Sequence, residues 1–511
     1  MVRGLYLTFG SAIDGAVNRT VQAVAARMLE RPLAGVSDVV PSYTKVYLEY
    51  DDARVRRDSV ARWAQRCVEG SGVSVARRLV EVPVAYQGPD LAEVAQRTAL
   101  SPDEVVARHA GRDYHVFALG FTPGFPFMGS LDPALRLPRR STPRARVAAH
   151  SVGIANDQTG VYPSVSPGGW NLLGTALVAM YDPHRPEPFL LRPGDDVRFV
   201  PSAAGALLPA PAPLPLLPEA PRHPFFEVVE SGLFDLVVDR GRAMMGRFGL
   251  ARSGPLDSWS AAHANRLIGN PPGAATLELN LRGPTLLARA AGLVGFAGWG
   301  LQPLRNGDAL DCFTVIAVER GDVLSFRPLP YGARAYLALP GGVESARFAG
   351  SASVDVRAGI GRALAVGDVL GAAAARDGVL PGSTARARLA SASIVGLGPG
   401  PFTLRIGPGP QASEAALRVL CEQPFVVRAA DRMGIRMAGA PVPAQEVISE
   451  PTPLGAVQIT ADGDPIVLLN DRGTLGGYAK PAIVDPRDLP RVGQLLPGQR
   501  VRFHRLERGT G

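Results

Sequence analysis

The chain has 511 residues, enough for three or four compact units and too many for one hydrophobic core. Hydrophobic residues make up 46% and charged residues 20%, which is typical of a folded globular protein. The formal net charge is +8, but the basic residues form no runs, which argues against a nucleic-acid-binding protein. No apolar run approaches the roughly 20 residues of a membrane helix, and the start lacks a signal-peptide core, so we expect a cytoplasmic protein.

The residue types that hold metals are sparse and widely spaced. The three cysteines form no CxxC pair, and the seven histidines show no HExxH or HxH spacing, so the sequence predicts no protein-held metal. The basicity is nearly all arginine, because Lys45 and Lys480 are the chain's two lysines. A GC-rich genome explains the arginine excess. A lysine retained in such a chain can do what a guanidinium cannot, because an ammonium can lose its proton.

Residues 1–85 alternate strand and helix signals, which predicts a compact α/β unit. The order βαββαβ is that of a ferredoxin-like fold. The expected elements are a strand at 4–9, a helix at 16–30, strands at 36–40 and 44–50, a helix at 57–69 and a strand at 78–84.

Residues 86–202 change from helical to β character. Ser101, Pro102 and Glu104 form a capping-box helix start, and this short helix is expected to end near Gly111. From Tyr114 the chain consists of short apolar runs broken by Gly and Pro, which indicates a barrel or a sandwich.

Residues 203–224 are expected to form a linker. Eight prolines lie between Pro201 and Pro224, and such a stretch is typical of a semi-rigid spacer that buries no core. It divides the chain into a front half, residues 1–202, and a rear half, residues 225–511.

A recurring turn predicts barrel-like lobes in both halves. A Gly turn followed by a strand occurs in PGDDVRF (193–199), RGDVLSF (320–326), VGDVL (366–370) and PGQRVRF (497–503). We therefore expect a mainly β protein with an α/β N-terminal unit, in which the rear half forms two barrel-like lobes at 225–385 and 386–511.

The segment 121–174 is dense in Gly, Pro, Arg and aromatic residues. Arginines at 139, 140, 144 and 146 alternate with prolines that keep the backbone extended, so two or more guanidiniums can converge on a carboxylate or phosphate. The alternative is a solvated arginine stretch. Trp170, beside Gly168 and Gly169, is either a wall of a ligand site or a plug at a barrel end.

Two histidines of the front half are candidate acid–base groups. His109 and His150 have the residue type that titrates near neutral pH. The alternative for each is a packed or exposed histidine without a catalytic role.

The rear half carries a second set of candidate residues. Asp257 is the expected N-cap of a helix that runs to about Leu267, although a helix start can also bind an anion. Arg432, Tyr478 and Lys480 lie in Gly-rich segments, where an ammonium can meet a phosphate or a developing oxyanion. The alternative for Lys480 is a surface lysine after a turn. The sequence contains no GxxxxGK[ST] phosphate loop, no GxSxG and no biotin attachment site.

These segments resemble two known families. GFTPGFPFMGSLDPAL, PRRSTPRARV, TGVYP and SPGGWNLLG resemble allophanate hydrolase subunit 1 (KipI, PxpB). DRGRAMMGRFGLARSGPLD, ANRLIGNPPGAATLE, DRMGIRMAG and LGGYAK resemble subunit 2 (KipA, PxpC). These are the small 5-oxoprolinase subunits, here in one chain, and the resemblance implies cyclophilin-like β-barrel lobes after an α/β unit.

The resemblance also implies an activity, the ATP-dependent opening of the 5-oxoproline lactam to glutamate, shared with a third subunit of the LamB/YcsF type. ATP with magnesium would be the cofactor, at a site that the sequence does not locate. An arginine-rich site suits phosphate chemistry, so we expect Arg139 and Arg144 to hold anions and Trp170 to form a ligand wall. In the rear half we expect Arg432, Tyr478 and Lys480 to act.

The sequence departs from the family pattern at three positions. His150 stands where glycine is more usual, and Ala352 and Val354 stand where an arginine and a threonine are common. Each departure can alter the substrate or leave one lobe without activity.

Two other functions are compatible with the same resemblance. The modules also resemble the carboxyltransferase region of urea carboxylase, which would need a biotin carboxylase and a biotinyl carrier from other chains. KipI-type modules resemble inhibitors that bind a sporulation histidine kinase. Self-association into homo-oligomers is compatible with all three hypotheses.

Overall fold

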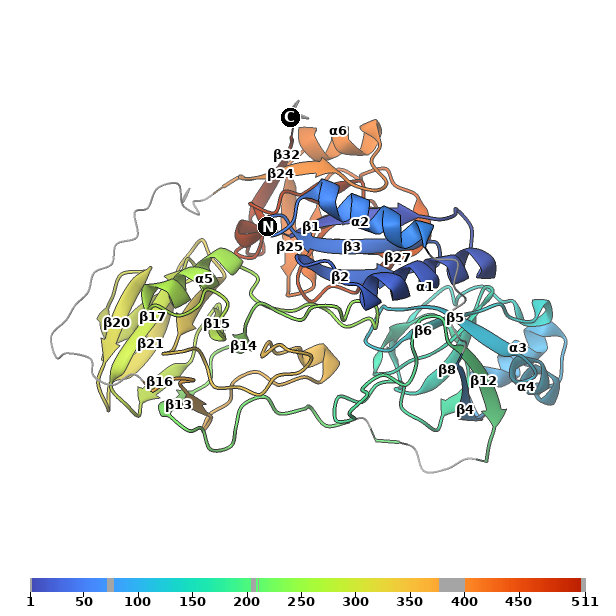
Figure 1. Cartoon of the computed structure of the whole chain (residues 1–511), viewed down its shortest axis with the longest axis horizontal. Helices are drawn as coiled ribbons and strands as arrows, with labels where there is room; N and C mark the ends of the chain where they lie inside the picture. Colours follow the sequence, from blue (N-terminus) through green and yellow to red (C-terminus); the bar gives the residue numbers. More distant parts are fainter. Residues whose placement is uncertain (1, 71–77, 204–207, 210, 376–399, 507–511) are drawn as a thin grey trace.

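The computed structural model describes residues 2–70, 78–203, 208–209, 211–375 and 400–506. Four bodies are visible in Figure 1: a blue α/β unit, a teal first barrel, a yellow two-sheet lobe and an orange second barrel. The α/β unit of the front half lies against the rear half, where β3 (Lys45–Asp51) contacts β27 (Glu446–Pro451). The two halves are therefore packed against each other.

The α/β unit is a three-stranded antiparallel sheet covered by two helices on one face. Its strand order is β1-β3-β2. On β3, Val46, Leu48 and Tyr50 pack against the helices, while the alternate residues Tyr47 and Glu49 point to the opposite, polar face. The elements are β1 (Val2–Thr8), α1 (Gly15–Glu30), β2 (Val36–Pro41), β3 (Lys45–Asp51) and α2 (Arg57–Glu69).

The ferredoxin-like prediction is wrong in its last strand. β4 (Leu79–Ala85) leaves the α/β unit and pairs in parallel with β12 (Asp196–Pro201) of the first barrel. Val82 and Val84 are buried in the barrel core, so the boundary at residue 85 falls after a barrel strand. Local periodicity predicts a strand but not its partner, which a contact across more than 110 residues decides here.

The first barrel closes in the order β11-β4-β12-β5-β6-β9-β8. Helices α3 (Leu91–Thr98) and α4 (Pro102–Ala110) connect β4 to β5, and the predicted capping box at Ser101 and Glu104 is confirmed. A separate two-stranded antiparallel sheet consists of β7 (Arg144–Val147) and β10 (Ser166–Gly168). The other strands are β5 (Asp113–Leu119), β6 (Pro126–Gly129), β8 (Ser151–Ala155), β9 (Gln158–Val161) and β11 (Asn171–Ala176).

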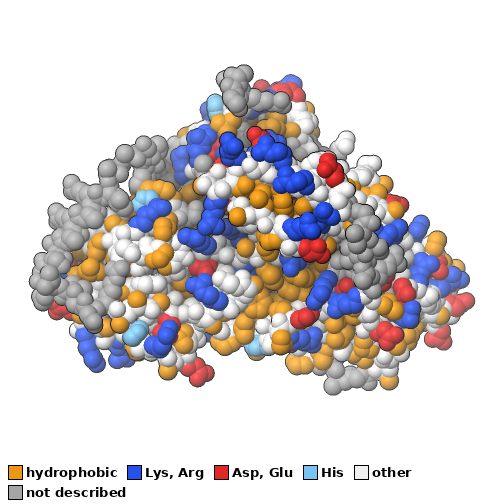
Figure 2. Space-filling view, viewed as in Figure 1, with side chains coloured by type: hydrophobic (Ala, Val, Ile, Leu, Met, Phe, Trp, Pro, Cys, Tyr) orange, Lys and Arg blue, Asp and Glu red, His pale blue; other side chains and the backbone are white. Residues whose placement is uncertain are grey.

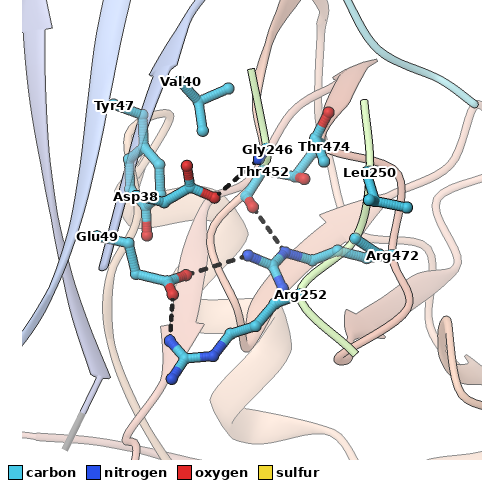
Figure 3. A pocket seen from close by; sticks show the side chains of 11 residues that line it. Asp38, Val40, Tyr47, Glu49, Gly246, Leu250, Arg252, Thr452, Arg472 and Thr474 are labelled. Carbon is cyan, nitrogen blue, oxygen red and sulfur yellow. Dashed lines mark hydrogen bonds and ion pairs between the residues drawn. The ribbon is translucent and has the colours of Figure 1, made fainter. Parts of the chain in front are cut away.

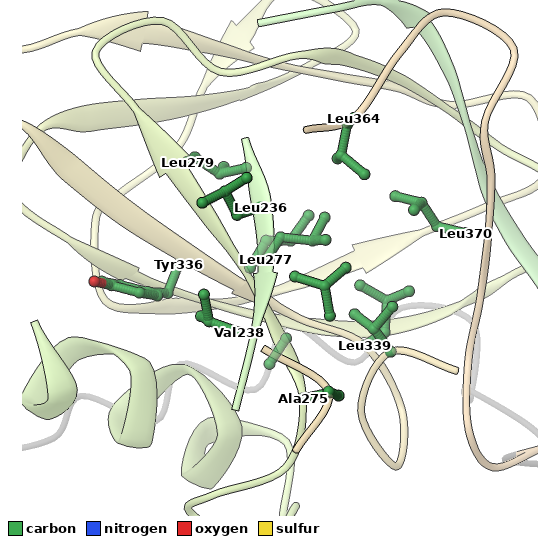
Figure 4. Packing of buried hydrophobic residues seen from close by; sticks show 14 of the residues in the cluster. Leu236, Val238, Ala275, Leu277, Leu279, Tyr336, Leu339, Leu364 and Leu370 are labelled. Carbon is green, nitrogen blue, oxygen red and sulfur yellow. The ribbon is translucent and has the colours of Figure 1, made fainter. Parts of the chain in front are cut away.

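The first rear lobe consists of two sheets, and neither closes, so the expectation of a barrel at 225–385 is corrected. The orders are β19-β18-β21-β16-β13-β23 and β14-β15-β22-β17-β20. A leucine-rich core lies between the sheets (Figure 4), with α5 (Ser258–Leu267) packed on β17 and β22. The strands are β13 (Pro224–Glu230), β14 (Leu236–Val238), β15 (Thr276–Asn280), β16 (Thr285–Ala288), β17 (Gly292–Gly298), β18 (Leu301–Arg305), β19 (Asp308–Ala309), β20 (Thr314–Val318), β21 (Val323–Pro328), β22 (Arg334–Ala338) and β23 (Val369–Gly371).

The second barrel closes in the order β24-β31-β28-β29-β26-β25-β32. Helix α6 (Glu414–Glu422) follows β24, and β27 (Glu446–Pro451) pairs with β30 (Leu475–Tyr478) in a separate two-stranded sheet. The predicted boundary at 385/386 lies outside the described residues. The other elements are β24 (Phe402–Pro408), β25 (Phe425–Ala430), β26 (Gly434–Ala438), β28 (Ala456–Ile459), β29 (Pro465–Leu468), β31 (Ala482–Val484), α7 (Leu489–Val492) and β32 (Arg500–Arg505).

The recurring glycine turn is confirmed in all four places. Gly194, Gly321, Gly367 and Gly498 have φ angles of 91°, 97°, 89° and 88°, and a strand follows each turn. A side chain strains this left-handed backbone, which explains why glycine recurs. Two of the turns precede β12 and β32, the last strand of each barrel.

Charged groups do not form a single-sign surface on the face seen in Figure 2. Basic side chains there are interspersed with acidic and hydrophobic ones. In the described part of the chain, no helix is long and apolar enough to span a membrane.

The linker packs against the two-sheet lobe, contrary to the prediction of a spacer that buries nothing. The Leu214 amide donates to the Gly359 carbonyl at 2.8 Å, and the Gly361 amide donates to the Leu214 carbonyl. Leu216 is 3% exposed and belongs to the core of the lobe. The prolines keep this segment extended, so its leucines can reach the neighbouring lobe.

A Leu216→Ala variant is expected to release this segment. Removing a buried leucine costs about 2–5 kcal/mol, and the loss falls on a locally anchored segment outside the strands. Limited proteolysis should therefore cut the linker at least roughly tenfold faster than in the wild type. Leu208→Ala, at an exposed linker position, is the matched control, and equal cleavage rates in both variants would refute the anchoring role.

Candidate functional site

The two lysines of the chain meet at one buried carboxylate, Glu450. The Lys480 side chain is 0% exposed, and its Nζ lies 3.1 Å from Glu450 Oε1. Lys45, from the front half, pairs with Glu450 Oε2. Gln411 donates to Glu450 Oε1 at 2.7 Å. We call Lys45, Glu450, Lys480 and Gln411 the two-lysine cluster.

Local strand geometry directs these side chains toward one another. Lys45 begins β3 and shares the polar face of the sheet with Tyr47, because alternate residues of a strand point the same way. That face packs against β27, which carries Glu450. Lys480 follows β30, and its Nζ also donates to the Tyr478 carbonyl at 2.9 Å.

The cluster holds more positive than negative charge in a buried place. Burial lowers the pKa of Lys480, which Glu450 partly offsets, and the nearby Lys45 charge lowers it further. Burial acts to raise the pKa of Glu450, but Lys480, Lys45 and Gln411 together hold it below its usual range. Two ammonium groups share one carboxylate, so the cluster favours an anionic ligand or a developing negative charge.

A pocket lies between the polar face of the sheet and the rear half (Figure 3), and none of the four cluster residues lines it. Asp38 and Glu49 line it from the front half. Arg252 and Arg472 approach from the rear half and both pair with Glu49, at 2.6 Å and 3.3 Å. Thr474, directly before β30, also lines the pocket, and its buried Oγ1 has no hydrogen-bond partner in the described residues.

Asp38 is the titratable group of this pocket. Its carboxylate accepts from the amides of Gly246 and Val39, both at 3.0 Å. Burial and then the nearby Glu49 charge raise its pKa from 3.8 to about 7.

The stability of the wild type relative to an Asp38→Asn variant should therefore fall as pH rises from about 4 to about 7. In this range the unfolded aspartate releases its proton while the folded one retains it, so raising the pH favours unfolding. Asparagine does not ionise and lacks this dependence. Melting temperatures of both proteins across this range provide the measurement, and a difference that does not change with pH would contradict the raised pKa.

The front arginines converge as predicted, but on a carboxylate of the protein itself. Arg144 donates to both oxygens of Asp90, at 2.6 Å and 3.0 Å, and Arg140 donates to the same carboxylate at 3.1 Å. The Arg144 guanidinium is thus paired within the protein, and its role in holding an external anion stays a prediction. Arg139 is exposed and forms no ion pair with the described residues, so its role stays a prediction.

Trp170 is packed rather than open to a ligand. Its side chain lies in an aromatic cluster, 5.5 Å from the Phe125 ring centre and 6.5 Å from that of Tyr162, and the residue is 5% exposed. The alternative of a plug at a barrel end fits this position, and the ligand-wall prediction does not.

The two histidines are also buried. His109 bonds through its ring nitrogens to Tyr86 and Thr159, and burial lowers its pKa to about 3, so it is a neutral core residue rather than a catalytic one. His150 has a φ of 66°, which explains why glycine suits this position. Its ring nitrogens have no partner in the described residues, and burial lowers its pKa.

The predicted rear residues divide into structural and site residues. Asp257 caps α5 by accepting from the Ser260 amide at 2.9 Å, which confirms the capping role, and its other oxygen accepts from Gln494 at 2.7 Å. Arg432 is buried between Glu278 and Asp471, so it is also paired within the protein, and its anion-holding role stays a prediction too. Lys480 and the half-exposed Tyr478 lie at the candidate site.

The two other departures from the family pattern are core positions. Ala352 and Val354 are buried in the two-sheet lobe and alternate with Ser351 and Ser353, whose hydroxyls bind Asp239. Neither belongs to the two-lysine cluster.

Sequence reasoning misses Glu450, Gln411 and the pocket. The signal that leads to them is the rarity of lysine, because both lysines of the chain lie in one cluster. That rarity singles out Lys45 in the sequence without assigning it to a site.

Two seven-stranded barrels, an α/β unit and a two-sheet lobe define a protein of the carboxyltransferase-domain class. The family model described as carboxyltransferase domain, subdomain C and D, matches residues 2–191, and the one described as carboxyltransferase domain, subdomain A and B, matches residues 248–505. The chain belongs to this family and joins counterparts of the B- and C-subunits of 5-oxoprolinase in one polypeptide.

Three similar proteins support this assignment. The B-subunit of Bacillus subtilis 5-oxoprolinase is 42% identical over 211 residues, which are 38% of this chain and 88% of that protein. The C-subunit of Escherichia coli 5-oxoprolinase is 28% identical over 288 residues, 54% of this chain and 90% of that protein. The protein in the crystal structure of TTHA0988 has 51% sequence identity to this chain, and the two structures align with a TM-score of 0.92. The match covers 99% of this chain and 100% of that one.

Proposed function

We propose that this protein is a component of an ATP-dependent 5-oxoprolinase, which opens the lactam of 5-oxoproline to L-glutamate in the cytoplasm with a LamB/YcsF-type partner subunit. The observation that carries the proposal is the composite two-lysine cluster. The counterparts of the two 5-oxoprolinase subunits each supply one of its lysines, Lys45 and Lys480, to Glu450. A site built from both halves explains why the two modules work together.

The cluster can perform the proton transfers of lactam opening. Water attacks the carbonyl carbon and gives its proton to Glu450, while Lys45 stabilises the charge that develops on the carbonyl oxygen. Lys480 gives a proton to the ring nitrogen as the C–N bond breaks. The 3.1 Å contact between Lys480 and Glu450 then lets the proton on Glu450 return to Lys480. The products are a carboxylic acid and an amine, which exchange a proton in water.

ATP with magnesium enters the proposal as the energy source. The arginines that line the pocket, Arg252 and Arg472, are both paired with Glu49. ATP is therefore assigned to no residue of this chain, and no step above passes through it. In the overall reaction, opening the lactam consumes one water molecule and hydrolysing ATP consumes a second.

The test is reconstitution. The purified chain is mixed with its LamB/YcsF-type partner, ATP, magnesium and 5-oxoproline, and glutamate release is measured. Release that requires every component supports the proposal. No glutamate, with ATP intact, would exclude 5-oxoproline as the substrate.

Carboxyl transfer is the second candidate function. It is favoured by the match of both halves to families described as carboxyltransferase domains. The biotinyl carrier and biotin carboxylase would then come from other chains. Recovery of a biotinylated protein with this chain, detected on a biotin blot, would move carboxyl transfer to first place.

Inhibition of a kinase through a KipI-like contact ranks third. The composite cluster between the two halves favours an enzyme-complex component over a free inhibitor. A pull-down that recovers a histidine kinase rather than a LamB/YcsF-type protein would reverse this order.

A further inference from the structure

The two barrels are topological copies of each other. Read from its first strand, the front barrel runs β4-β12-β5-β6-β9-β8-β11 and the rear barrel runs β24-β32-β25-β26-β29-β28-β31. In each barrel the first and last strands pair in parallel. Each barrel also has a helical connection after the first strand and a separate two-stranded sheet, β7–β10 or β27–β30. Positions in one barrel can therefore be matched to positions in the other.

Hydrogen bonds fix the match at the candidate site. In the front barrel the Asp90 amide donates to the Leu172 carbonyl, and the Leu172 amide donates to the Asp90 side chain, at 3.1 Å and 2.7 Å. In the rear barrel the Gln411 amide donates to the Lys480 carbonyl, and the Lys480 amide donates to the Gln411 side chain, at 3.4 Å and 2.9 Å. Leu172 thus corresponds to Lys480, and Asp90 corresponds to Gln411.

The two-stranded sheets give the third matched position. Gly168 of β10 faces Arg144 of β7, and Gly476 of β30 faces Glu450 of β27. The matched residues contact the matched partners, because Arg144 pairs with Asp90 as Glu450 pairs with Gln411. Arg144 and Glu450 therefore occupy equivalent places.

The chemistry differs between the copies although the backbone is shared. The front copy contains an apolar Leu172 and a carboxylate, Asp90, closed by two guanidinium donors. The rear copy contains a buried ammonium, Lys480, and a carboxylate that a second ammonium reaches from the α/β unit. Trp170, next to the front strand pair, is 5% exposed, whereas the matched residue Tyr478 is 40% exposed. The two clusters are both largely buried, so they differ in the groups that they hold: an ammonium, Lys480, stands in the rear copy where the apolar Leu172 stands in the front copy.

We propose that the substrate, which carries a carboxylate, binds only at the rear barrel, where it contacts Lys45 and Lys480. The matched front cluster of Asp90, Arg140 and Arg144 is a structural clamp. Gln411 is a positioning residue, which holds both the Lys480 backbone and the Glu450 side chain. The identity of the substrate rests on the proposed function, whereas the assignment of the active barrel does not.

The rarity of lysine makes a direct test available. Protein labelled with ¹³Cε-lysine gives two side-chain signals, one for Lys45 and one for Lys480. 5-Oxoproline and, separately, formate as a simple carboxylate are titrated into the full chain. We expect the ¹³C chemical shifts of both lysine signals to change and to reach a plateau as the concentration of the added molecule rises. If neither molecule moves either signal, the rear site is refuted, whether or not the reconstituted complex releases glutamate.

Matched variants then compare the barrels. Lys480→Met and Leu172→Met place the same side chain at the two equivalent positions. Lys480→Met is expected to lower the rate of glutamate release at least roughly 100-fold, whereas Leu172→Met stays within about twofold of the wild type and retains the lysine shifts.

A positioning role for Gln411 predicts that Gln411→Glu, which can still accept from the Lys480 amide, displaces the pH–rate profile. Loss of the ¹³C shifts in Leu172→Met, with Lys480→Met still active, would overturn the assignment in favour of the front barrel. If the wild-type complex releases no glutamate, the 5-oxoprolinase function is refuted. The chemical-shift changes of the two lysines then still show whether the rear barrel binds a carboxylate.

Discussion

An Arg432→Met variant is expected to lose about 3–5 kcal/mol of unfolding free energy, because it breaks a buried ion-pair network. Arg432 is 7% exposed and pairs with Glu278 of the two-sheet lobe and with Asp471 of the second barrel. It also donates to the Gly254 carbonyl at 2.7 Å. Methionine fills much of the volume but leaves two buried carboxylates without this cation. The loss falls on the interface between the two rear lobes.

The loss of unfolding free energy in the Arg432→Met variant should become smaller as the pH falls. Burial acts to raise the pKa of Glu278, but Arg432 and then Arg334 hold it below its usual range. In the wild type this pairing contributes stability above the unfolded pKa of about 4.5, and the contribution is lost as pH falls through the folded pKa. The difference between wild type and variant is therefore greatest near neutral pH and shrinks in acid.

Thermal melting of the full chain measures this effect, with an expected fall of about 5–10 °C at neutral pH. Arg436→Met, at an exposed arginine of β26, is the matched control and should change little. A double variant, Glu278→Gln with Arg432→Met, should recover part of the loss, because one of the unpaired carboxylates is gone. An Arg432→Met protein as stable as the wild type would show that the network does not hold the lobes together.

A Glu450→Gln variant is expected to lower the rate of glutamate release by roughly 10²–10⁴-fold, the range typical of a lost acid–base group. Glu450 is the carboxylate between Lys45 and Lys480 and the proposed acceptor of the proton from water. Glutamine keeps the shape but neither accepts that proton nor balances the two ammonium groups. The pKa of Lys480, already lowered by burial, should fall further, because the attraction of Glu450 is removed.

Two measurements separate this role from a structural one. The rate of the reconstituted complex reports the chemistry, and the ¹³Cε signal of Lys480 across pH reports its charge in the same protein. Glu446→Gln, at an exposed glutamate of the same strand, is the control and should leave both unchanged. A Glu450→Gln protein with wild-type rate and an unmoved Lys480 signal would remove the cluster from the mechanism.

Sequence reasoning succeeds where neighbouring residues decide the structure. The capping box at Ser101 and the Asp257 cap form as predicted, because a cap satisfies amides within the next three residues. The glycine turns before the closing strands are local in the same way. The convergence of Arg140 and Arg144 is also predicted from their extended backbone, although the anion they meet is Asp90, 50 or more residues earlier in the chain.

The amino-acid sequence by itself therefore determined four helices (α1, α2, α4 and α5), the strands of the front unit, the glycine turns with the strands after them, and the two rare lysines. It did not predict α3, α6 or α7. Only the tertiary structure decided that β4 joins the first barrel, that the lobe after the linker opens into two sheets, and which candidate residues are already paired. It also brought Lys45 to Glu450, 405 positions away. Periodicity and capping act over a few residues, whereas strand partners and buried ion pairs depend on which distant surfaces pack together, and no local pattern records that choice.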